Sequence, residues 1–234
     1  MAKDRVRKDI SVGDIEISDI TQRTVVLIGG KGSGKSTAIR QLAREANSVK
    51  LPVILFDPTG ALKVDEFNVV SVQQGFTEEE LDALRRIIRA IWKRKQILVI
   101  DVSDLTREEN SLLANDVFGD LFKRHTGVVM IDEIPEFVPQ FGAFKSEELI
   151  RFVRKCRNKN IGVVMATQRP ASVSKEVLAL GDLYMIFRVQ HPPDRETVSK
   201  LFSLHYESKS EVNGVVNKIT TFSPGMCRVV DFSS

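Results

Sequence analysis

Short apolar runs recur along the chain, and longer amphipathic stretches separate them. Most of these runs are rich in valine and isoleucine and do not alternate with polar residues, which is typical of strands buried on both faces of a sheet. The runs expected to form such strands are residues 24–28, 54–57, 68–72, 97–102, 128–131, 161–167 and 183–189. A terminal strand is expected at residues 226–232, after a turn at Pro224 and Gly225.

Helices are predicted in the stretches between these strands. Thr77 with Glu80, and Thr106 with Glu109, have the spacing of a capping box, in which each side chain bonds the backbone N–H of the other residue. Ser146 is expected to cap a third helix. The remaining helices are expected at residues 35–45 and 194–202. Strands that alternate with helices favour an α/β fold, in which a mainly parallel sheet is flanked by helices.

Composition narrows the class of protein only a little. The chain has 234 residues, of which 42% are hydrophobic and 28% are charged, as in an ordinary globular protein. Its net charge of +3 permits an anionic partner. Two cysteines without CxxC spacing and three scattered histidines argue against a disulfide or a zinc site. The helix after Thr77 has a basic outer face, either solvated or a surface for a partner or nucleic acid, made by Arg85, Arg86, Arg89, Lys93 and Arg94.

The chain is expected to form a single domain at residues 24–234, after an arm or lead-in strand at residues 1–23. Within that arm, residues 13–17 alternate in polarity and are expected to form a short edge strand. The apolar runs are too short for a transmembrane helix, and the charged N-terminus lacks the apolar core of a signal peptide. A cytoplasmic location is therefore expected.

The first long apolar run is followed by the pattern of a phosphate-binding loop. Residues 29–36 fit G-x-x-x-x-G-K-[ST] without a departure, between a predicted strand and a predicted helix. The glycines can take positive φ, so that successive N–H groups point at phosphate oxygens, and the helix N-terminus adds partial positive charge. The residues expected to hold the phosphates are Gly29, Gly30, Lys31, Gly32, Ser33, Gly34, Lys35, Ser36 and Thr37.

Three side chains at the end of this loop have separate expected roles. Lys35 would reach the β- and γ-phosphates, the Ser36 hydroxyl would ligate Mg²⁺, and Thr37 would contact the α-phosphate. The alternative is a glycine turn without a ligand, but the flanking strand and helix argue against it. The sequence therefore predicts binding of a nucleoside triphosphate together with Mg²⁺.

A pair of acidic residues ends a later apolar run. Asp132 and Glu133 follow residues 128–131 and are expected at the carboxyl edge of the sheet, where ligands bind in open α/β folds. Asp132 is expected to bind Mg²⁺ through water, and Glu133 to hold the attacking water as a general base. The second acid favours hydrolysis over binding alone.

Gln168 and an arginine complete the predicted site. Gln168 ends the next strand, where its amide could contact the γ-phosphate and the attacking water; the alternative is an amide bonded to backbone. Arg151, Arg154 and Arg157 lie on one flank of the preceding helix and are either surface residues or the source of an arginine finger. Of these, Arg157 lies nearest to the apolar stripe. Asp57, which ends a strand, is expected to form a turn.

These motifs resemble those of the FtsK–HerA superfamily of P-loop motor ATPases. The most specific match is KCRNKNIGVVMATQRP at residues 155–170, because FtsK-type motors have a similar Lys-x-Arg, an apolar strand and Ala-Thr-Gln-Arg-Pro. The acidic pair, in MIDE and followed by Phe137, is similar to that family's acid-pair strand. Further similarities lie in Phe187-Arg188-Val189 with Pro192 and Asp194, and in Ser223-Pro224-Gly225. The resemblance covers residues 24–230.

The resemblance implies a RecA-like P-loop NTPase fold with a short terminal hairpin. It also implies ATP hydrolysis with Mg²⁺ and translocation of double-stranded DNA by a homo-oligomeric ring, hexameric or pentameric. A neighbouring subunit would supply an arginine, for which Arg157 is the best-matching position. The DNA backbone would be gripped without reading sequence, and residues 139–145 and 169–175 are candidate DNA-contacting loops.

One branch of the superfamily fits best. The sequence shows no barrel of the HerA kind, and no membrane anchor or winged-helix tail of the FtsK kind. It therefore most resembles the genome-packaging ATPases of membrane-containing icosahedral viruses. That resemblance implies a capsid or portal protein as a partner, and the host cytoplasm or the virion as the location.

Two other functions are kept as alternatives. A coupling ATPase of conjugation or secretion would move a protein or nucleoprotein substrate, although such proteins usually have a membrane anchor or an inserted helical domain. A small-molecule P-loop kinase would need an arginine-rich lid and a pocket for a phosphoryl acceptor. The pairing of Glu133 with Gln168 argues against the kinase.

Overall fold

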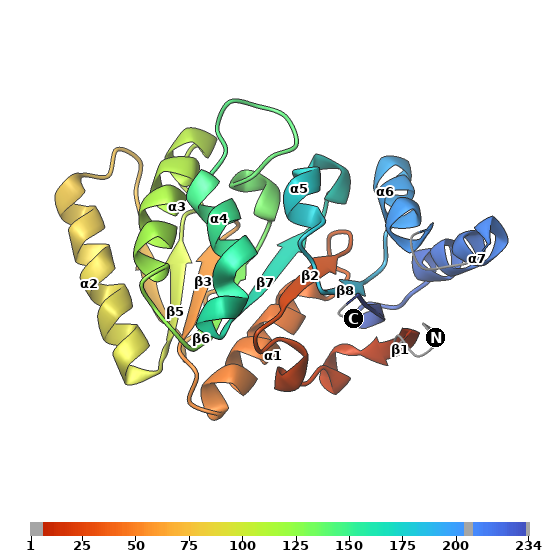
Figure 1. The fold of residues 1–234 in the computed structure, drawn as a ribbon, viewed down its shortest axis with the longest axis horizontal. Helices are drawn as coiled ribbons and strands as arrows, with labels where there is room; N and C mark the ends of the chain where they lie inside the picture. The colour runs from red at the N-terminus through yellow and green to blue at the C-terminus, as the bar shows by residue number, and fades with distance from the viewer. Residues whose placement is uncertain (1–6, 204–207, 233–234) are drawn as a thin grey trace.

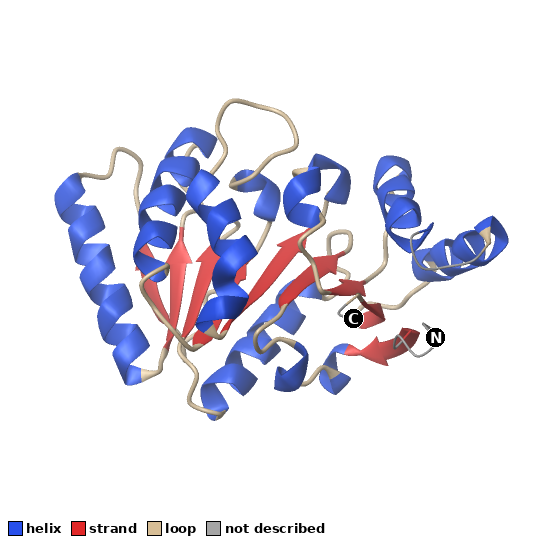
Figure 2. Ribbon diagram, in the orientation of Figure 1, coloured by secondary structure: helices blue, strands red, loops and turns tan. Residues whose placement is uncertain are grey.

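The computed structural model describes residues 7–203 and 208–232, which contain a nine-stranded sheet flanked by helices (Figures 1 and 2). The strands are β1 (Arg7–Ser11), β2 (Thr24–Ile28), β3 (Val53–Asp57), β4 (Asn68–Ser71), β5 (Ile97–Asp101), β6 (Gly127–Ile131), β7 (Ile161–Thr167), β8 (Leu183–Ile186) and β9 (Met226–Asp231). Their order is β1-β9-β8-β2-β7-β6-β3-β5-β4. Neighbours from β8 to β4 are parallel, and β9 is antiparallel to β8 and β1. The predicted α/β fold with a mainly parallel sheet is confirmed.

Helices cover both faces of this sheet. The α-helices are α1 (Lys35–Ser48), α2 (Glu78–Arg94), α3 (Arg107–Leu121), α4 (Glu147–Lys155), α5 (Lys175–Leu178), α6 (Pro192–Ser203) and α7 (Lys209–Thr220). Short 3-10 helices are η1 (Val12–Asp14), η2 (Ile17–Asp19), η3 (Ile134–Glu136), η4 (Cys156–Lys159) and η5 (Pro170–Ser172). Figure 1 shows α2, α3 and α4 in front of the sheet and α1 behind it. Among the described residues, no helix is long and apolar enough to span a bilayer.

Alternate residues of the central strands contribute to two separate hydrophobic clusters. Val26 and Ile28 of β2 lie in a cluster with residues of α2, α3 and α4, whereas Val25 and Leu27 lie in a cluster with residues of α1. Both faces are buried, which explains why the strand is apolar at every position. Because β2 lies between β8 and β7, the phosphate loop leaves the sheet at the middle of its carboxyl edge.

The N-terminal arm differs from the prediction. Residues 13–17 form no strand, and instead span η1 and the start of η2. The Asp14 carboxylate accepts the Ser11 N–H at 3.0 Å, and the Asp19 carboxylate accepts the Glu16 N–H at 3.1 Å. Such local side-chain bonds offer the backbone an alternative to a strand ladder. The edge strand of the arm is β1, which pairs with β9.

The C-terminal part also differs in its connections. The last strand is antiparallel to β8 as a hairpin would be, but α6 and α7 connect the two strands, and β9 also pairs with β1. Neither α5 nor α7 was predicted. The N-terminus of α7 is capped by Ser208, whose hydroxyl accepts the Glu211 N–H at 3.2 Å, and Val212, Val216 and Ile219 are buried. This capping box and helical spacing are the signal that could have revealed α7.

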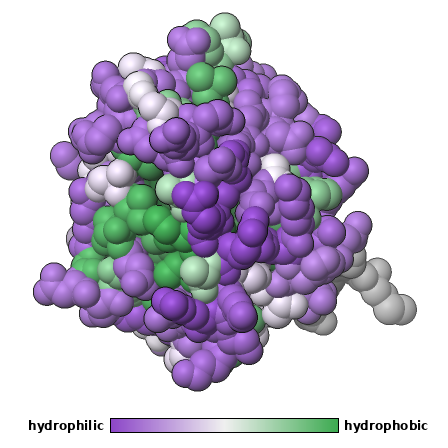
Figure 3. Space-filling model, turned by 90° about the vertical axis from the view of Figure 1, so that its left-hand side faces the viewer, coloured by the Kyte–Doolittle hydropathy of each residue, from purple (hydrophilic) through white to green (hydrophobic). Residues whose placement is uncertain are grey.

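The basic face of α2 is partly used within the fold. Arg85 pairs with Asp82 and with Asp116 of α3, whereas Arg86 and Arg89 are exposed. Viewed from this side, the molecule has hydrophobic surface surrounded by hydrophilic residues (Figure 3). A groove of about 190 Å³ between β4 and α2 is lined by apolar side chains that include Val70, Val72, Phe76, Leu81, Leu84 and Ile87. These side chains lie at the edge of the sheet that ends with β4.

Gly162 of β7 tests how closely the N-terminal arm packs on the sheet. A Cβ at this position would lie 2.1 Å from the Ile20 carbonyl oxygen, so we expect Gly162→Ala to lower the free energy of unfolding by about 1–3 kcal/mol. The control is Gly119→Ala in α3, where a Cβ meets nothing within 4 Å and should be neutral or stabilise by about 0.5–1 kcal/mol. Denaturant unfolding measures both, and equal stabilities would contradict the prediction.

Candidate functional site

The phosphate loop connects β2 to α1 and is held at its start by neighbouring segments. The Gly29 N–H donates to the Thr167 carbonyl at 3.2 Å, at the end of β7. The Gly30 N–H donates to the Arg188 carbonyl at 2.8 Å, just after β8. These bonds fix the direction in which the loop leaves the sheet.

Two glycines of the loop have left-handed backbone conformations, with φ of 72° at Gly32 and 111° at Gly34. Glycine enters this region readily, and L side chains rarely do. Gly34 also lies against the C-terminal turn, where a Cβ would be 2.8 Å from the Gly225 nitrogen. The Gly225 N–H donates to the Ser33 carbonyl at 2.8 Å, and the Gly225 carbonyl accepts the Val12 N–H at 2.8 Å. Segments from both ends of the described chain thus support the loop.

The Lys35 side chain turns back onto the loop. Its Nζ donates to the Gly29 carbonyl at 2.6 Å and to the Gly30 carbonyl at 3.2 Å. Only 5% of the residue is exposed, and this burial lowers the pKa of the ammonium, while the charges of Asp132 and Glu133 act in the opposite direction. The ammonium is therefore preorganised inside the loop, where phosphate oxygens would be its ligands.

Asp132 lies at the carboxyl end of β6, beside the start of α1. Its N–H donates to the Phe56 carbonyl at 3.0 Å, and both its side chain and the Ser36 hydroxyl belong to residues that line the same cavity. Burial raises the pKa of this carboxyl, and the Lys35 ammonium opposes the rise. A carboxylate next to a hydroxyl is the hard-oxygen donor set that Mg²⁺ accepts alongside phosphate oxygens. Ser36 and Asp132 therefore fit the predicted metal site.

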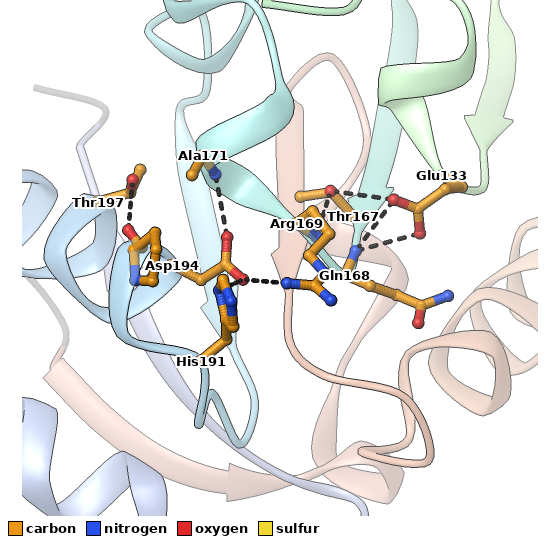
Figure 4. Close-up of polar contacts among 9 residues, drawn as sticks. Glu133, Thr167, Gln168, Arg169, Ala171, His191, Asp194 and Thr197 are labelled. Carbon is orange, nitrogen blue, oxygen red and sulfur yellow. Dashed lines mark hydrogen bonds and ion pairs between the residues drawn. The ribbon is translucent and has the colours of Figure 1, made fainter.

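Glu133 lies next in the chain and contacts residues at the end of β7. Its φ of 48° is in the left-handed region, and its carboxylate accepts the Gln168 N–H at 3.1 Å and the Thr167 hydroxyl at 3.3 Å (Figure 4). Burial raises the pKa of this carboxyl, and the bond from the Gln168 N–H opposes the rise. The structure thus brings two of the predicted catalytic residues into contact, through the backbone of Gln168 and the side chain of Glu133.

A cavity of about 720 Å³ lies at this edge of the sheet, within the usual size of about 300–1,000 Å³ for ligand pockets. The predicted residues that line it are Lys31, Gly32, Ser33, Gly34, Lys35, Ser36, Thr37, Asp132 and Gln168. The lining residues that the sequence analysis missed are Val12, Thr59, Ala61, Pro224 and Gly225. The turn that carries Thr59 forms as expected at Asp57, whose carboxylate accepts N–H groups of Thr59 at 3.0 Å and Leu62 at 2.7 Å. Gly29, Gly30 and Glu133 are not among the lining residues.

Arg157 lies away from the cavity. It belongs to η4, which precedes β7, and so is at the opposite edge of the sheet from Gln168. Its guanidinium is more than half exposed and lies 2.6 Å from the Asp182 carboxylate, which in turn accepts the Thr24 N–H at 2.8 Å. The chain does not bring Arg157 to its own site, and its role at the site of a neighbouring subunit stays a prediction.

Gly34 and Gly32 offer a matched test of the loop. We expect Gly34→Ala to weaken ATP binding more than about tenfold, because a Cβ would both strain the backbone and meet Gly225. Gly32→Ala needs the same left-handed backbone conformation, but its Cβ meets nothing within 4 Å. Its loss of ATP affinity should therefore stay below about fivefold. Calorimetric titration with ATP measures both affinities. Equal losses in the two variants would contradict a close approach at Gly34.

Comparisons of the fold find P-loop ATPases. The genome-packaging NTPase B204 of Sulfolobus turreted icosahedral virus 2, in complex with ATP-gammaS, is 20% identical with a TM-score of 0.63, over 90% of this chain and 92% of that chain. VirB4 of Thermoanaerobacter pseudethanolicus is 13% identical with a TM-score of 0.57, over 89% and 88%. The bacterial conjugative coupling protein TrwB, as TrwBdeltaN70 with sulphate, is 13% identical with a TM-score of 0.57, over 86% and 78%.

Comparison of the sequence with curated proteins gives no significant match. The profile of the family described as AAA domain matches residues 19–172, which are more than half of the chain and include the phosphate loop, Asp132, Glu133 and Gln168. The P-loop fold predicted from the sequence is confirmed. The chain belongs to the AAA domain family of P-loop ATPases.

Proposed function

We propose that this protein is an ATP-hydrolysing motor that translocates double-stranded DNA, and that it packages a viral genome into a capsid. The observation that carries the ATPase part is the contact of Glu133 with Gln168 at 3.1 Å, beside a cavity lined by Lys35 and Asp132. A site for binding alone would need no second carboxylate at this place. The DNA-packaging part is supported by the resemblance of motifs and by the fold shared with B204.

In the proposed site, the loop N–H groups and Lys35 bind the β- and γ-phosphates, and Thr37 contacts the α-phosphate. Ser36 and Asp132 hold Mg²⁺, which would supply positive charge to the phosphate oxygens. Glu133 accepts a proton from the attacking water, whose oxygen bonds to the γ-phosphorus as the bond to ADP breaks. The raised pKa of Glu133 suits a base that must take up this proton.

The proposed assembly is a homo-oligomeric ring of five or six copies. Arg157 would reach the γ-phosphate of a neighbouring copy, because it is exposed and remote from its own cavity. DNA would be held through its backbone without base reading, with residues 139–145 and 169–175 as candidate contacts. A capsid or portal protein is the proposed partner, in the host cytoplasm or the virion.

A coupling ATPase of conjugation or secretion is the second candidate function. The fold similarity to VirB4 and to the conjugative coupling protein TrwB favours it. The two candidates differ in substrate, since a coupling ATPase would engage a protein or nucleoprotein. Recovery of channel proteins from cells, in place of capsid proteins or DNA alone, would favour this second candidate.

The first experiment measures ATP hydrolysis with and without linear double-stranded DNA of several sequences. We expect DNA of any sequence to stimulate hydrolysis, and the stimulation to fade as salt rises, because the contacts are to phosphates. Glu133→Gln should keep ATP binding and lose more than about 100-fold in kcat. The control, Glu136→Gln, changes a residue of the same segment whose carboxylate is 3.2 Å from Arg107, and should hydrolyse ATP at the wild-type rate.

Hydrolysis without DNA stimulation in an assembled ring would overturn the translocase proposal and favour the coupling ATPase. Substantial turnover by Glu133→Gln would remove this residue from the role of base.

Mixing of two inactive variants tests whether Arg157 acts between subunits. Lys35→Ala should lose nucleotide binding, and Arg157→Ala should lose hydrolysis but keep binding. In mixed rings, an Arg157→Ala subunit can use the arginine of a Lys35→Ala neighbour, so we expect activity to return to at least about a tenth of wild type. Arg154→Ala is the control, since this arginine pairs with Glu176 at the surface. Wild-type activity of assembled Arg157→Ala would assign the finger to another residue.

A further inference from the structure

Asp194 is a buried carboxylate in the first turn of α6, and only 2% of its side chain is exposed. Its Oδ1 accepts the Ala171 N–H at 3.2 Å. Its Oδ2 lies 3.1 Å from His191 Nδ1 and 3.8 Å from the Arg169 guanidinium (Figure 4). The residue does not line the nucleotide cavity. The site described above therefore gives no reason for an acid at this position.

The groups that Asp194 contacts belong to the segment that follows Gln168. Residues 168–171 turn from β7 into η5, and they are held by carboxylates at both ends. Glu133 accepts the Gln168 N–H at 3.1 Å, and Asp194 accepts the Ala171 N–H at 3.2 Å. Figure 4 shows the Gln168 side chain pointing away from Arg169 and Asp194. A shift of this turn would thus move Gln168 and the hydrogen bond that holds Glu133.

The helix that carries Asp194 is attached to the site a second time. The chain from α6 through α7 leads to the turn at Pro224 and Gly225, which lines the cavity, and the Gly225 N–H donates to the Ser33 carbonyl at 2.8 Å. Figure 1 shows α6 and α7 on the side of the sheet where β8 and β1 lie. The turn that follows this helical pair therefore contacts the phosphate loop, and the first turn of the pair contacts the segment after Gln168.

We infer that Asp194 is a positioning residue for ATP hydrolysis, an inference that rests on the proposed ATPase function. Its Oδ1 holds the Ala171 N–H, and this fixes the turn at residues 169–171 on α6. Because this turn is fixed, the Gln168 amide stays in the cavity and the Gln168 N–H stays at the Glu133 carboxylate. Misplacement of reacting groups by about 1 Å can cost about 100-fold in rate, so a single buried hydrogen bond can have a large effect on kcat.

An acid that acts only through its charge on the helix would respond differently to substitution by asparagine. An acid in the first turn of a helix interacts favourably with the helix dipole through its charge, which asparagine lacks. Asparagine keeps an acceptor oxygen in the place of Oδ1, so it can still bond the Ala171 N–H. The positioning role therefore predicts rescue by Asp194→Asn, whereas a role through charge predicts that this variant resembles Asp194→Ala.

The experiment compares kcat with the affinity for a non-hydrolysable ATP analogue, in the full chain and in the presence of DNA. We expect Asp194→Ala to lower kcat at least about tenfold and to change the affinity less than about threefold. Asp194→Asn should stay within about threefold of the wild-type kcat. The matched control is Glu196→Gln, an exposed acid of the same helix that lies 2.7 Å from Lys200, and it should match the wild type.

A wild-type kcat in Asp194→Ala would overturn the inference, and so would an equal loss of kcat and affinity, or a failure of asparagine to rescue. If Asp194→Ala does not fold, Asp194→Ser takes its place, because serine suits the start of a helix and its hydroxyl is too short to replace Oδ1. The rate of ATP hydrolysis by the wild type distinguishes a failure of this inference from a failure of the proposed function. No hydrolysis by the wild type would overturn the ATPase itself, whereas hydrolysis with unchanged variants would overturn only the role of Asp194.

Discussion

A buried positive charge governs how the site is built. Only 5% of Lys35 is exposed, and an ammonium taken out of water is costly unless other groups compensate it. The Gly29 and Gly30 carbonyl oxygens bond it directly, and the charges of Asp132 and Glu133 act on it from the end of β6. The parallel order β2-β7-β6 brings these groups to the same edge. The strand order of the sheet is therefore what brings together the groups that compensate the charge of Lys35.

The strand between them, β7, links the charged site to the rest of the molecule. After its end, the Gln168 N–H donates to the Glu133 carboxylate and the Ala171 N–H donates to the Asp194 carboxylate. The same strand begins beside η4, where Arg157 is exposed. Gln168 thus follows one end of β7, and Arg157, which is proposed to act at the site of a neighbouring copy, precedes the other. Seven strand residues, buried at every position, lie between these two segments.

Local patterns were predictable, and contacts between distant segments were not. Eight contiguous residues specify the phosphate loop, and Asp132, Glu133 and Gln168 each end an apolar run, so their place at the carboxyl edge followed from strand direction alone. Val12 and Gly225 line the same cavity, but no spacing in the sequence relates them to the loop. Residues 13–17 had the alternation of a strand, yet aspartate side chains bond their backbone into 3-10 turns. Competition of this kind depends on geometry that a polarity pattern does not contain.

The contact between Ser33 and Gly225 also bears on the order in which the protein becomes functional. The loop is made early during synthesis, whereas the turn that completes its cavity follows almost two hundred residues later in the chain. A partly synthesised chain therefore has the phosphate-binding sequence but an incomplete cavity. Contacts between such distant residues form late, because the entropy of closing a long loop opposes them. Nucleotide binding would then stabilise chains whose last strand is already in the sheet more than chains in which it is not. Nucleotide binding would thus favour completely folded chains over incompletely folded ones.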